Sequence, residues 1–160
     1  MNQTDHIDLS NASSFAFWSP VTIRYSDQDE LGHINNCSYI AYVEAGRVAF
    51  LGGLLDPAGH AGIDFILAHI AVDYLKEGHY PGTINVGSRI LSLGNKSITT
   101  GYGLFINKEC KATAECVNIY FRPETRETLV IPADIRTRLE ADPMQTERGA
   151  KIRKINAEST

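Results

Sequence analysis

The spacing of apolar residues predicts a strand near the start of the chain. In residues 15–26, single polar residues separate Val21, Ile23 and Tyr25. This period of two is typical of a strand with one buried face. We therefore expect a half-buried strand in this segment.

A different period follows in residues 38–51, where apolar residues recur every three or four positions. Tyr39, Val43, Gly46 and Phe50 fall on one stripe, which predicts a helix of about four turns with a broad buried face. Glycine inside a helix costs about 1 kcal/mol relative to alanine. We therefore expect Gly46 to mark a close approach of the helix to a flat neighbour such as a sheet.

The rest of the chain is rich in strand-like runs of eleven or twelve residues, and a short helix over 131–140 follows them. Consecutive strands usually pair, so we expect these runs to form an antiparallel meander. One long helix against one curved sheet predicts an α+β fold of two layers. The four runs are 65–76, 83–93, 97–107 and 111–121.

Composition and charge narrow the class of protein. The chain has 160 residues, of which 43% are hydrophobic and 21% charged, and a formal net charge of −4. These values suit a single globular domain and argue against nucleic acid as a partner, because nucleic-acid binders are usually basic. We expect a flexible leader over 1–14, one domain over 15–140, and a polar, mobile tail over 141–160.

Targeting and redox signals are weak. The longest apolar run, residues 48–55, is much shorter than the roughly 20 residues that a membrane-spanning helix needs. The N-terminal residues lack the basic and apolar segments of a signal peptide, so we expect a cytoplasmic protein with no membrane partner. Three cysteines without a CxxC pair predict free thiols.

The densest group of chemically active side chains lies between the predicted strand and the predicted helix. The segment RYSDQDELGHINN contains Asp27, Asp29, His33, Asn35 and Asn36. A carboxylate in this position can activate water or attack an acyl group, and free N–H groups at the helix start can hold an oxyanion. The plainer interpretation is a turn in which Asp and Asn only satisfy backbone groups, with an Asn as the helix N-cap.

Three further interpretations of this segment are weaker. A calcium loop would need ligands where Leu31 and Ser38 stand. An aspartyl phosphotransferase would need a doubly wound fold, which the strand-rich second half does not supply. Asp27, Asp29 and His33 have no spacing that defines a metal geometry, so we expect no metal site.

The segment RYSDQDELGHINNCSYIAYVEAGR closely resembles the D-x-D-x-x-G-H-[VI]-N-N-x-x-Y-x-x-Y-x-E-x-x-R signature of hotdog-fold acyl-CoA thioesterases, in the branch that includes 4-hydroxybenzoyl-CoA thioesterase. A second stretch, VDYLKEGHYPGTINVGSRILSLGNKSIT, is similar to the strand-turn-strand segment of that family. The resemblance extends from about Trp18 to Leu139. It implies a hotdog fold, in which a five-stranded antiparallel sheet wraps around one long central helix. It also implies a homodimer or homotetramer with the active site at the dimer interface.

The resemblance also implies roles for individual residues. Asp29, the second aspartate of D-x-D, matches the catalytic carboxylate, which implies a nucleophile or general base, while Asp27 matches a position with a structural or orienting role. No metal or organic cofactor is implied. The positions that the resemblance and the chemistry of CoA phosphates suggest for substrate are His33, Asn35, Asn36, Tyr39 and His69, and those for CoA are Arg89, Lys96 and Ser97.

Two classes of function remain open from the sequence. The first is an acyl-CoA thioesterase that depends on Asp29, and the second is a non-catalytic module that binds acyl-CoA or regulates through it. The complete motif with Asp29 favours the enzyme. A third possibility, dehydratase chemistry on an acyl chain, would need a differently placed His and acid pair. The identity of the acyl group, and CoA or acyl carrier protein as its carrier, are left open.

Overall fold

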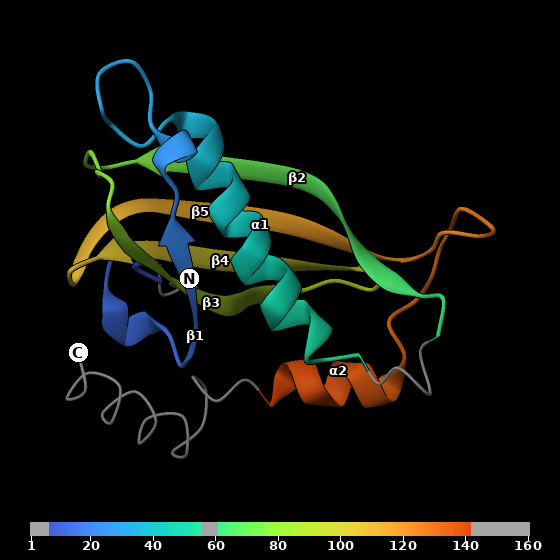
Figure 1. Cartoon of the computed structure of the whole chain (residues 1–160). Coiled ribbons are helices and arrows are strands. Elements are labelled where there is room, and N and C mark those ends of the chain that lie inside the picture. Colours follow the sequence, from blue (N-terminus) through green and yellow to red (C-terminus); the bar gives the residue numbers. More distant parts are fainter. Residues whose placement is uncertain (1–6, 56–60, 142–160) are drawn as a thin grey trace.

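A computed structural model of the chain describes residues 7–55 and 61–141, in which a curved sheet wraps around one long helix (Figure 1). This arrangement confirms the predicted α+β hotdog architecture. None of the helices in these residues is long and apolar enough to cross a membrane. In chain order the elements are the 3₁₀ helix η1 (Ala12–Ser14), β1 (Phe17–Ile23), the 3₁₀ helix η2 (Tyr25–Asp27), α1 (Asn36–Gly52), β2 (Asp64–Tyr74), β3 (Gly82–Leu93), β4 (Ser97–Ile106), β5 (Glu109–Arg122), β6 (Glu127–Thr128) and α2 (Ala133–Glu140).

The strand order differs from the predicted meander. Along the sheet the order is β1-β3-β4-β5-β2, every pairing is antiparallel, and the two-residue β6 pairs with β5. Thus β2 pairs with β5 at one edge and does not pair with β3. A hairpin between β2 and β3 would need a tight turn, whereas residues 75–81 carry the chain past the start of α1, where Ile34 N donates to Gly78 O at 2.9 Å. The prediction that all four runs form a meander was therefore wrong for β2.

The helix α1 lies on the inner face of the sheet. Its N-cap is Asn35, whose side chain accepts a hydrogen bond from Ser38 N at 2.8 Å, as the Asn-rich turn predicted. Val43 is fully buried, and an added Cβ at Gly46 would lie 2.5 Å from Val86 Cγ1 on β3. The predicted close approach of the helix to a sheet at Gly46 is confirmed.

Residues 7–14 differ from the predicted flexible leader, because they pack against the outer side of the sheet. Leu9 is buried and forms a small cluster with Phe15 and Phe105. The Arg89 guanidinium donates a hydrogen bond to Ser14 O at 3.0 Å, which fixes the end of η1. Residues 1–6 and, apart from Ala141, the predicted tail lie outside the described residues.

A second hydrophobic cluster lies at the C-terminal end of α1. The helix α2 packs near the C-terminal end of α1 (Figure 1), and Ile135 and Leu139 on α2 contact the same cluster as Leu51. The turn between β3 and β4 lies at this end, where Arg136 donates to Gly94 O at 2.7 Å. The opposite end, where α1 begins, is therefore the one that carries the chemically active turn.

Candidate active site

Asp27 occupies a buried position at the bend after β1. Its carboxylate accepts hydrogen bonds from Arg24 N at 2.8 Å, from Arg24 Nη2 at 2.8 Å and from Tyr42 Oη at 2.6 Å. Burial alone would raise the pKa of Asp27, but these hydrogen bonds outweigh it and hold the pKa below its ordinary value. With every bond directed to the protein itself, Asp27 fixes the bend. These contacts also end the strand at Ile23, three residues before the predicted end.

Asp29 lies two residues further on and is exposed. Its Oδ1 accepts hydrogen bonds from the backbone N–H groups of Leu31 at 2.9 Å and His33 at 3.0 Å. The turn is completed by Gly32, whose φ of +76° is one that residues with side chains rarely adopt. Among the described residues nothing donates to the second oxygen, Oδ2. The turn therefore holds the carboxylate in place by one oxygen and leaves the other free.

The start of α1 lies beside this turn. The Asn35 side chain is used in capping the helix, so of the two asparagines it is Asn36 that borders the hollow beside Asp29. The first N–H groups of any α-helix have no partner within the helix and carry partial positive charge. The neighbourhood of Asn36 can therefore stabilise an oxygen that becomes negative during a reaction.

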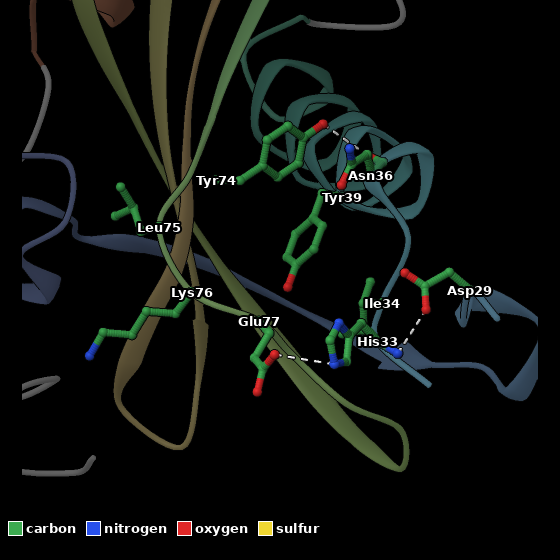
Figure 2. A pocket seen from close by; sticks show the side chains of 9 residues that line it. All are labelled: Asp29, His33, Ile34, Asn36, Tyr39, Tyr74, Leu75, Lys76 and Glu77. Carbon is green, nitrogen blue, oxygen red and sulfur yellow. Dashed lines mark hydrogen bonds and ion pairs between the residues drawn. The ribbon is translucent and has the colours of Figure 1, made fainter. Parts of the chain in front are cut away.

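Asp29 lies on the wall of two hollows. One has a volume of about 260 Å³ and extends over the start of α1 and the end of β2 (Figure 2). The other has a volume of about 430 Å³ and extends over the D-x-D turn. Asp29 is the residue that they share. The first is lined by Asp29, His33, Ile34, Asn36, Tyr39, Tyr74, Leu75, Lys76 and Glu77, and the second by Tyr25, Ser26, Gln28, Asp29, Glu30 and Gly32.

Tyr39 forms the floor of the smaller hollow. Its side chain projects from α1 with the hydroxyl directed towards the segment that carries Lys76 and Glu77 (Figure 2). The residue is 3% exposed, and its hydroxyl has no hydrogen-bond partner in the described part of the chain. Burial, together with the nearby negative charge of Glu77, raises the pKa of Tyr39. The hydroxyl is thus a neutral, buried polar group close to Gly78.

The far wall of this hollow includes residues that the sequence analysis did not assign to a site. Glu77 Oε2 lies 3.1 Å from His33 Nε2, and Glu77 Oε1 lies 3.5 Å from His79 Nε2. The hydrogen bond from Ile34 N to Gly78 O brings this segment to the turn. A side chain at position 78 would collide with Tyr39 and Ile34. The glycine in K-E-G-H was the one sequence signal of this close approach.

The other predicted site residues lie elsewhere in the chain. His69 is exposed on β2, away from the hollow. Arg89 is buried and its guanidinium bonds to the backbone of Ser14, so it supports η1. Lys96 and Ser97 lie at the β3–β4 turn, and β3 spans roughly 35 Å of strand length between that turn and the site end. One chain therefore brings together Asp29, His33, Asn36 and Tyr39, but not the residues expected to bind CoA.

A curved antiparallel sheet around a central helix, with a carboxylate at the helix start, defines the general class, and comparisons with known proteins specify it. A model of the thioesterase-like superfamily matches residues 23–139. The chain therefore belongs to that superfamily.

Individual relatives agree with this assignment. The structure of a predicted thioesterase from Bacillus stearothermophilus is 29% identical, with 78% of this chain and 94% of that chain covered and a TM-score of 0.70. A thioesterase from Thermus thermophilus, solved with coenzyme A and Zn, is 27% identical, with 80% and 94% covered and a TM-score of 0.70. The uncharacterized protein YsmA of Bacillus subtilis (strain 168) is 26% identical over 90 residues, which are 56% of this chain and 61% of that protein. The match thus spans about three fifths of that curated relative.

Proposed function

We propose that this protein is an acyl-CoA thioesterase in which Asp29 is the catalytic carboxylate. The observation that supports this most is the environment of Asp29: two backbone N–H groups hold Oδ1, while no donor in residues 7–55 and 61–141 reaches Oδ2 at the junction of two hollows. Family membership supports thioester hydrolysis, and the Thermus relative solved with coenzyme A supports CoA as the carrier.

The chemistry needs few groups. An oxygen bonds to the thioester carbonyl carbon, the C–S bond breaks, and the thiolate leaves with little need of a proton because thiols have pKa values near 8.5. Asp29 Oδ2 either attacks the carbonyl, forming an anhydride that water then cleaves, or removes a proton from an attacking water. The N–H groups at the start of α1 hold the oxyanion. Neither route uses a metal or an organic cofactor.

The proposal includes a homodimer formed along β2. This strand is a long free edge with exposed apolar side chains, and such edges pair readily with another strand. An antiparallel pair of β2 strands sets the Asp64 end of one copy against the Tyr74 end of the other. Ile66 and Ser97 are both register partners of Ile119, so Ser97 belongs to the Asp64 end. In such a dimer, Lys96 and Ser97 of the second copy approach the hollow beside Asp29 and can meet CoA.

The test is release of free thiol from short, medium, long and aromatic acyl-CoAs in the presence of EDTA. We expect turnover by the wild type and a loss of at least about 100-fold in kcat for Asp29→Asn, because the amide can neither attack nor remove a proton. Glu124→Gln is the matched control, since this carboxylate is exposed in the turn after β5. It should behave as the wild type.

Two results would contradict the proposal. Equal activity of Asp29→Asn and wild type would remove Asp29 from the mechanism. Binding of acyl-CoA without thiol release from any substrate would instead favour a non-catalytic binding module, and hydration of an enoyl-CoA would favour dehydratase chemistry.

A further inference from the structure

Three side chains with metal-binding atoms meet at the rim of the hollow beside Asp29. They are His33 on the active-site turn and Glu77 and His79 on the connection between β2 and β3. One ligand atom from each lies within 4.8 Å of the others. Glu77 lies between the two histidines: its Oε2 is 3.1 Å from His33 Nε2, and its Oε1 is 3.5 Å from His79 Nε2.

These separations suit a small divalent ion. Zinc binds imidazole nitrogen and carboxylate oxygen at about 2.0–2.2 Å in a tetrahedron, which sets neighbouring ligand atoms roughly 3.3–3.5 Å apart. Each imidazole nitrogen lies near that distance from one of the two oxygens of Glu77, and one ligand atom from each of the three residues lies within 4.8 Å of the others. Two imidazoles and a carboxylate are also the ligand types that Zn²⁺ prefers when a fourth position stays open.

The proton on His79 gives an independent indication. His79 Nδ1 lies 3.1 Å from Gly32 O, and a carbonyl oxygen can only accept, so Nδ1 must carry the hydrogen. In the neutral ring Nε2 then has a lone pair and no proton, and it faces a carboxylate oxygen of Glu77. Two acceptors that face each other repel unless a cation or a water molecule bridges them, and a metal ion is one such cation. A histidine whose other nitrogen donates to a backbone carbonyl is typical of metal ligands.

We propose that His33, Glu77 and His79 form a site for a divalent transition-metal ion of the Zn²⁺ class. Two of its three ligands, His33 and Glu77, line the hollow whose floor is Tyr39 (Figure 2). The ion ties the turn that carries Asp29 to the connection after β2, and so fixes the rim of the hollow. The site rests on these contacts and not on thioester hydrolysis, which is expected to proceed in EDTA. It differs from the absence of metal expected from the sequence, where the metal hypothesis concerned Asp27, Asp29 and His33.

The experiment is a calorimetric titration of the metal-free full-length protein with ZnCl₂ at pH 7.5, with thermal unfolding followed at each point. We expect saturation at one Zn²⁺ per chain and a higher unfolding midpoint, because the ion binds the folded state. Glu77→Gln and His79→Gln should each weaken binding at least about tenfold.

Matched controls separate this site from adventitious binding. His69→Gln removes an exposed histidine on β2, and Cys37→Ser removes an exposed thiol on α1. Both should bind Zn²⁺ as the wild type does. Absence of stoichiometric binding, wild-type affinity in Glu77→Gln and His79→Gln, or loss of binding in either control would overturn the metal site. None of these results bears on thiol release in EDTA, so the two proposals fail separately.

Discussion

At the scale of single residues, the two aspartates of D-x-D have opposite surroundings. Asp27 is 1% exposed and uses both oxygens on Arg24 and Tyr42, whereas Asp29 is exposed and has a free oxygen. Two carboxylates separated by one residue thus have different tasks, because backbone geometry directs one inwards and the other into a hollow. The contrast predicts that they respond differently to the same substitution.

Asp27→Asn should lower the free energy of unfolding by about 1.5–3 kcal/mol at pH 7, because it removes a charged acceptor from a buried network. The pKa of Asp27 is lower in the folded state than its ordinary value near 3.9. Its contribution is therefore present above about pH 4 and is lost as the pH falls through the folded pKa. Urea unfolding at pH 7 and at pH 3 should show a difference between wild type and variant that shrinks in acid. A difference independent of pH would contradict this role.

Asp29→Asn should change the free energy of unfolding by no more than about 0.5 kcal/mol relative to the wild type.

At the scale of elements, the contact between α1 and β3 depends on Gly46. Alanine there would improve helix propensity by about 1 kcal/mol, but its Cβ would lie 2.5 Å from Val86 Cγ1 in a fully buried contact. Overpacking of a core costs about 1–3 kcal/mol, so after the gain in helix propensity we expect Gly46→Ala to destabilise the protein by up to about 2 kcal/mol. Gly52→Ala on the same helix meets open space and should be neutral or slightly stabilising. Thermal or urea unfolding of both variants measures the two changes in stability. A Gly46→Ala protein that is more stable than the wild type would show that the helix can move away from the sheet.

The elements also show what the sequence could and could not predict. Periodicity located α1 and the long strands to within a few residues, since burial of one face imposes the pattern locally. The pairing of β2 with β5 was missed, because register partners such as Asp73 and Thr113 are far apart in sequence. The same limit applies to the site: the turn from Asp29 to Asn36 is contiguous and was recognisable as a motif. Glu77 joins it only through the folded contact between Ile34 and Gly78.

At the scale of the whole molecule, the proposed dimer brings together two ends of the sheet that one chain keeps apart. The helix start supplies Asp29, but the β3–β4 turn with Lys96 and Ser97 lies at the other end of the sheet. The free edge of β2 carries Ile66 and Leu67, each 37% exposed. A two-fold dimer along this edge covers these side chains and joins the two ends. The proposed dimer would therefore account both for the exposed apolar edge of β2 and for the distance between Asp29 and the residues expected to bind CoA.

Lysine on an edge strand opposes pairing with another strand, so Ile66→Lys should convert the dimer to a monomer. Sedimentation velocity of the wild type and the variant measures this directly. Val130→Lys, which changes another exposed apolar residue outside β2, should leave the dimer intact.

If residues near CoA come from the second copy, thiol release by Ile66→Lys should fall together with the dimer fraction and recover at high protein concentration. A wild-type monomer, or a variant that stays dimeric, would contradict the β2 interface. A fully active monomer would show that one chain holds the complete site.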